Sequence, residues 1–139
     1  MYALRVSPQK WQPRDWGEEQ TSRIAQEVHR LRKSQKRSAH WLANRTAELG
    51  YAVTRPVISD IETGRRKYVT VSELMVLARA LNTTPIALLY PDPCADEIEM
   101  LPGVRTSGPY APQWFSGLVD VALDAHWIQS QPVCDDPAE

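Results

Sequence analysis

The chain has 139 residues and a formal net charge of −1 at pH 7, a length that suits one modest domain with an appendage and is short for two full domains. No apolar run approaches the roughly 18 residues of a membrane helix, so we expect a cytoplasmic protein. The two cysteines are too few for a disulfide framework, and we expect both to be reduced.

The small net charge conceals an uneven distribution along the chain. Residues 21–68 carry 11 basic residues against 4 acidic ones, whereas residues 91–139 carry 1 basic residue against 9 acidic ones. A concentrated excess of positive charge favours a polyanionic partner, although an ordinary solvated face can have the same composition. The middle of the chain is therefore the candidate region for a nucleic-acid contact.

The N-terminal part is predicted to be an arm followed by a helix. Residues 1–17 show neither helical nor strand periodicity and are expected to form the arm. Asp15 and Glu18 resemble a capping box, and apolar residues then recur at helical spacing. These signals predict a first helix that runs to about residue 34.

Two further helices with a tight turn between them are expected next. Ser38 is a suitable N-cap for a second helix, which Gly50 would end as a left-handed residue. A turn over residues 51–53 then leads to a short third helix at residues 54–63, with Thr54 as its N-cap. This pair of helices lies within the basic region.

The next two helices are the most clearly signalled. Thr70 and Glu73 form a predicted capping box for a fourth helix, and apolar residues line one face of it up to residue 81. Thr84 is the expected N-cap of a fifth helix that ends before Pro91. Together the five helices predict a domain over residues 18–90.

Residues 91–139 are predicted to form an acidic extension with a short strand at residues 98–101, one amphipathic helix at about residues 113–128 and a disordered tail. The apolar stripe of this helix has three alternatives: packing on the five-helix core, self-association or a ligand pocket. The candidate dimerisation residues are Trp114, Phe115, Leu118 and Val121.

The order of these elements resembles the lambda-repressor and Cro family of helix-turn-helix proteins. The resemblance covers about residues 21–90 and is carried by Leu31-Arg32, SAHWLA (38–43), VISDIETGRR (57–66) and TVSELMVLARALNTTPIALLY (70–90). It implies an all-α fold, a five-helix lambda-repressor-like domain with an extension that contains one further helix. Two features depart from the family: Ala39 replaces its usual glutamine, and the stretch from Ala43 to Ile58 is longer than typical.

The resemblance also implies roles for individual residues. In this family the third helix enters the major groove, where its N-terminal residues contact base edges while flanking basic residues contact phosphates. Arg32 and Glu62 match the positions of a buried ion pair that ties the first helix to the third. The implied base contacts are Arg55, Pro56, Val57, Ser59 and Asp60, and the implied backbone contacts are Lys36, Arg37, Ser38, Thr54, Arg65, Arg66 and Lys67.

These inferences favour a homodimeric, sequence-specific regulator of transcription that binds double-stranded DNA and acts as a repressor by occupying a promoter. The alternative is an antitoxin or partner-binding adaptor with the same fold, which the acidic extension keeps open. No nucleophile and base at motif spacing, no phosphate loop and no metal-ligand spacing are present, so we expect neither an enzyme nor a cofactor or metal. A small-molecule or protein effector is left open.

Overall fold

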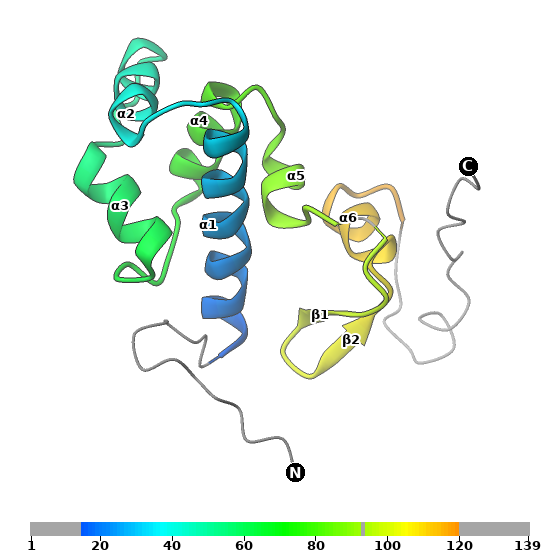
Figure 1. Cartoon of the computed structure of the whole chain (residues 1–139). Coiled ribbons are helices and arrows are strands. Elements are labelled where there is room, and N and C mark those ends of the chain that lie inside the picture. Colours follow the sequence, from blue (N-terminus) through cyan, green and yellow to red (C-terminus); the bar gives the residue numbers. More distant parts are fainter. Residues whose placement is uncertain (1–14, 93, 120–139) are drawn as a thin grey trace.

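The computed structural model describes residues 15–92 and 94–119, and this part of the chain is mostly helical with one small sheet (Figure 1). All five helices predicted between residues 18 and 90 are present. None of the described helices is both long and apolar enough to cross a membrane. In chain order the elements are α1 (Trp16–Ser34), α2 (Ala39–Glu48), α3 (Arg55–Thr63), α4 (Val71–Ala80), α5 (Pro85–Leu89), β1 (Ile98–Leu101), β2 (Val104–Thr106) and α6 (Tyr110–Phe115).

The predicted N-caps explain where most of these helices begin. A cap side chain accepts a hydrogen bond from a free amide of the first turn. Four of the predicted caps do so: Asp15 from Glu18, Ser38 from Trp41, Thr70 from Glu73 and Thr84 from Ala87. Thr54 is the exception, because it occupies the N-cap position of α3 without a side-chain hydrogen bond. Its hydroxyl therefore does not stabilise this helix as a cap.

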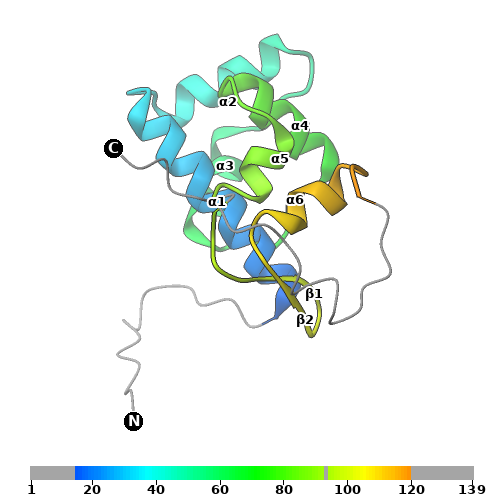
Figure 2. The same cartoon turned by 90° about the vertical axis from the view of Figure 1, so that its right-hand side faces the viewer.

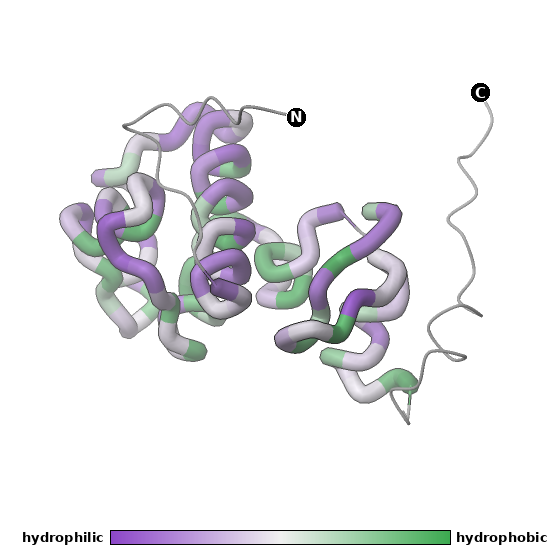
Figure 3. The backbone as a smooth tube through the Cα atoms, turned by 90° about the horizontal axis from the view of Figure 1, so that it is seen from below, coloured by the Kyte–Doolittle hydropathy of each residue, from purple (hydrophilic) through white to green (hydrophobic). Residues whose placement is uncertain are grey.

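The five helices share one hydrophobic core. α1 packs on α3 and α5, α2 packs on α3 and α4, and α4 packs on α5. Figure 3 shows α1 as largely hydrophilic with hydrophobic positions recurring along it, the pattern of a helix that buries one stripe. Each fully buried large side chain contributes about 1.5 to 3 kcal/mol. The residues at most 1% exposed include Val28, Leu42, Ile58, Leu77, Leu81 and Leu88.

A small appendage of β1, β2 and α6 lies beyond α5 (Figures 1 and 2). β1 is the predicted strand, and it pairs with β2 in an antiparallel hairpin that was not predicted. The Trp16 indole of α1 donates a hydrogen bond of 3.0 Å to the Glu99 carbonyl oxygen, which ties the hairpin to the first helix. Gly108 is required where the chain returns, because a Cβ there would lie 2.4 Å from the carbonyl oxygen of Ala95.

Two expectations for the extension are wrong. α6 ends at Phe115, because Ser116 closes it and Gly117 adopts a left-handed conformation (φ 74°), so the helix predicted over residues 113–128 is interrupted early. Residues 120–128 lie outside the described residues. Cys94 is disulfide-bonded, which contradicts the expected reduced thiol.

At the other end of the chain, α1 already begins at Trp16, inside the predicted arm.

Candidate nucleic-acid interface

The turn between α2 and α3 is fixed by a buried threonine. The Thr46 hydroxyl donates to the Ala43 carbonyl (2.8 Å) and accepts from the Val53 amide (2.9 Å). Gly50 has φ 98° and ends the helix in the predicted left-handed conformation. Val53, although part of the turn, is 2% exposed and belongs to the core. α3 is therefore held at a defined position against α2.

α3 has one buried face and one exposed face. Ile58 and Ile61 are each 1% exposed and pack into the core. Residues four apart lie on the same side of a helix, so the exposed positions 55, 59 and 63 form a single stripe. The exposed side chains of this helix are Arg55, Pro56, Ser59 and Thr63. The stripe begins with a guanidinium group at the helix N-terminus.

Two of the implied base contacts lie away from the open stripe. Val57 is half-buried and packs against the hydrophobic core, so it is less available to a thymine methyl group than its sequence position implied. The Asp60 carboxylate lies 3.7 Å from the Arg65 guanidinium. Both side chains of this pair are substantially exposed, so the pair contributes little to stability and leaves both groups accessible.

A bidentate ion pair ties α3 to α1, at the positions that the family resemblance implied. Arg32 donates to both carboxylate oxygens of Glu62, at 2.9 and 2.8 Å, and both side chains are buried. Arg32 also donates to the Arg37 carbonyl oxygen at 3.1 Å. Hydrogen bonding to Glu62 raises the pKa of Arg32. One side chain thus fixes both α3 and the basic segment that precedes α2.

That basic segment is exposed beside the start of α2. Lys36 adopts a left-handed backbone conformation (φ 54°) and is exposed. Arg37 is also exposed, and its guanidinium group lies 4.4 Å from the centre of the Trp41 ring. A cation–π contact is an electrostatic attraction to the ring and leaves the guanidinium group charged. Lys36 and Arg37 directly precede Ser38, whose hydroxyl caps α2.

The three basic residues after α3 differ in how far they are free to bind another molecule. The Arg65 side chain is 77% exposed. Arg66 instead forms a salt bridge with Glu73 of α4, lies 4.2 Å from the Tyr68 ring centre and is only 19% exposed. The Lys67 ammonium lies 3.4 Å from Glu18 of α1. Arg66 therefore links this segment to α4 and Lys67, whose side chain is 42% exposed, links it to α1, and the DNA contact that the resemblance implies for them stays a prediction.

The candidate dimerisation residues differ in how far they are exposed to solvent. Trp114 is half-buried and packs against the core. Phe115 is half-exposed and meets the Tyr90 ring edge-on at 6.0 Å. Leu118 is 78% exposed. Val121 lies outside the described residues, so Phe115 and Leu118 are the exposed members of this set among the residues that the structure describes.

Comparisons with family models, with characterised proteins and with solved structures found no match to this chain. Within residues 15–92 and 94–119, no group of three or more histidine, cysteine, aspartate or glutamate residues could hold a metal ion. A function for the chain has to be inferred from the geometry of its own residues.

Proposed function

We propose that this protein is a sequence-specific regulator of transcription that binds double-stranded DNA through a lambda-repressor-like helix-turn-helix unit. α2 and α3 form this unit, and α3 is the recognition helix. The observation that carries the proposal is the exposed stripe of α3, which begins with Arg55, together with exposed cations in the segments before α2 and after α3. Binding to a promoter would act by occupancy and repress transcription.

The dimensions of α3 suit the major groove of DNA. Its nine residues span ~13 Å along the axis at a rise of about 1.5 Å per residue. The groove is about 12 Å wide and admits one helix, whose exposed N-terminal residues reach the base edges. The stripe of positions 55, 59 and 63 is exposed, and an arginine such as Arg55 can bind guanine O6 and N7 bidentately.

The flanking cations suit the two phosphate backbones that border the groove. Lys36 and Arg37 precede α2 and Arg65 follows α3 in the sequence, and Arg32 holds the Arg37 carbonyl beside Glu62 near the end of α3. Lysine and arginine contacts to phosphate supply affinity without sequence information. The proposed backbone contacts are therefore Lys36, Arg37 and Arg65, together with the exposed Ser38 and Thr54.

The Arg65 contact can be tested against a matched arginine elsewhere on the surface. We expect Arg65→Ala to weaken binding to every duplex and to lower the slope of log K against log salt by about 0.9. Arg105 of β2 is similarly exposed and paired with an acidic residue, Glu97, so Arg105→Ala is the control and should leave the slope unchanged. Equal losses in the two variants would contradict the proposed interface.

We further propose that the protein binds DNA as a homodimer, since one short helix makes few base contacts and a two-fold pair reads two half-sites. Leu118→Asp places a charge on the exposed apolar surface beside Phe115 and should shift sedimentation towards the monomer at fixed concentration. Met75 on α4 is also exposed, and Met75→Asp is the control. Dissociation by the control alone would assign the dimer interface to α4.

A further inference from the structure

An apolar cavity of about 230 Å³ lies where the helical domain meets the appendage. Its lining comes from four parts of the chain that are far apart in sequence. α1 and α5 form the side towards the helical domain, and β1 and α6 form the side towards the appendage. The lining residues are Trp16, Gln20, Leu89, Tyr90, Met100, Leu101, Trp114 and Phe115.

The walls of this cavity are held in place by specific contacts. The hydrogen bond from Trp16 to the Glu99 carbonyl joins α1 to β1 across a separation of 83 residues. On the opposite side, the rings of Tyr90 and Phe115 meet at an interplanar angle of 71°. Met100 is 1% exposed and forms part of the core. The cavity is therefore a formed space between two packed units and not a gap between mobile segments.

The chemistry of the lining restricts what can bind. Four of the eight lining residues are aromatic, three are aliphatic or thioether side chains, and Gln20 contributes the one amide. No charged side chain is among these lining residues, so a charged ligand would lose its hydration without an ionic partner. Aromatic side chains favour offset and edge-on contact with a planar ring.

We propose that this cavity is a binding site for a small, uncharged, planar aromatic molecule of one or two rings, with one polar group that meets the Gln20 amide. An apolar cavity of about 150 Å³ accommodates benzene, so the larger volume here suits a molecule of up to two fused rings. The ligand would contact the helical domain and the appendage at the same time. The proposal concerns a site separate from α3 and does not depend on DNA binding.

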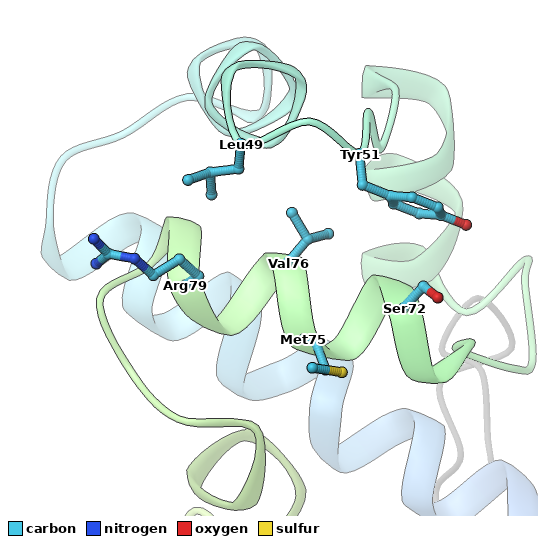
Figure 4. Close-up of a pocket in the computed structure, with 6 residues that line it drawn as sticks. All are labelled: Leu49, Tyr51, Ser72, Met75, Val76 and Arg79. Carbon is cyan, nitrogen blue, oxygen red and sulfur yellow. The ribbon is translucent and has the colours of Figure 1, made fainter.

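A second hollow on the surface is a useful contrast. It measures about 370 Å³ and lies between the end of α2 and α4, where Val76 points towards Leu49 and Tyr51 (Figure 4). Arg79 and Ser72 also line this hollow. The side chains of Tyr51 and Met75 are about half exposed to solvent. This hollow is open and partly polar, and it serves as the control position.

Indole is a suitable probe, because it is planar, neutral and carries one N–H donor. We expect it to cause saturable shifts of the Trp16 and Trp114 indole N–H resonances in ¹⁵N-labelled full-length protein. Leu101→Trp fills the cavity from its half-buried edge and should weaken indole binding by at least about tenfold. Met75→Trp changes the other hollow and should alter the affinity by less than about twofold. Thermal unfolding of each variant verifies that it is folded.

A second variant separates the polar contact from the shape of the site. Gln20→Leu should weaken the binding of indole while leaving the binding of indene, its hydrocarbon analogue without the N–H group, equal or tighter. The proposal is overturned if indole causes no saturable shift of Trp16 or Trp114. It is equally overturned if Leu101→Trp binds indole as tightly as the unmodified chain does.

Discussion

Replacing Arg32 by alanine should destabilise the folded protein by about 3 to 5 kcal/mol. The change leaves the buried Glu62 carboxylate without its bidentate partner and removes the hydrogen bond to the Arg37 carbonyl. The half-exposed His29 ring, 3.4 Å from Glu62, would stay beside the carboxylate, but a buried charge without its guanidinium partner is costly because hydration no longer compensates it. Chemical denaturation, monitored by far-UV circular dichroism, measures the free energy of unfolding directly.

A double replacement distinguishes this cause from a simple loss of packing. Arg32→Met combined with Glu62→Met removes both charges and keeps apolar volume, so it should cost far less than Arg32→Ala alone. Arg105→Ala is the control, because Arg105 pairs with Glu97 and both of these side chains are more than half exposed. That control should change stability by about 0.5 kcal/mol or less. A double variant as unstable as Arg32→Ala would show that charge burial is not the cause.

Replacing Arg55 should have the largest effect on sequence preference. We expect Arg55→Ala to cost about 1 to 3 kcal/mol on the preferred duplex and to relax selectivity at one base pair, while binding to scrambled duplexes changes much less. The reason is that a guanidinium contact to guanine recognises the base, whereas a phosphate contact is independent of sequence. Titration of matched and scrambled duplexes measures both quantities.

The conservative variant sharpens this expectation. Arg55→Lys keeps the positive charge but loses the planar fork that binds two acceptors at once. It should therefore retain most of the affinity for scrambled duplexes and still lose preference for the original base pair. If Arg55→Lys keeps full selectivity, or if Arg55→Ala lowers both affinities equally, the position of Arg55 in the recognition helix is wrong.

Local sequence signals predicted the helices well because they depend on residues close together in the chain. The capping box of Thr70 and Glu73 and the left-handed Gly50 are both present as expected. Ile58 and Ile61, three residues apart, share the buried face of α3, as helical periodicity requires. The same logic failed at α6, where Gly117 interrupts an apolar repeat that otherwise continues at helical spacing.

Contacts between distant residues were harder to predict. The ion pair of Arg32 and Glu62 was expected only through the family resemblance, since nothing in the spacing of 30 residues indicates it. Arg66 and Lys67 follow α3 in a run of three cations, and the family resemblance implied that they contact the DNA backbone. Their partners on other helices, Glu73 and Glu18, emerge only when the chain is folded. Arg65 pairs with the partly exposed Asp60 carboxylate, and its contact with a phosphate stays a prediction.

The strand β2 was also missed, although Pro102 and Gly103 lie between the paired strands. A Pro-Gly dipeptide is a turn signal, and Gly103 has the positive φ of 74° that such a turn requires. The strand itself has three residues, too few to show an alternating pattern. The hairpin matters for the site at the junction, because β1 contributes Met100 and Leu101 to the cavity.

Selection of binding sites from a pool of randomised duplexes, with the full-length protein and no assumed operator, tests DNA recognition most directly. The proposed function predicts enrichment of one motif, arranged as two related half-sites about 10 to 10.5 base pairs apart from centre to centre. Arg55→Ala should lose the preference at one symmetric position of that motif. Recovery of unselected sequences, with equal binding of the enriched and starting pools, would contradict the proposal that this chain reads DNA.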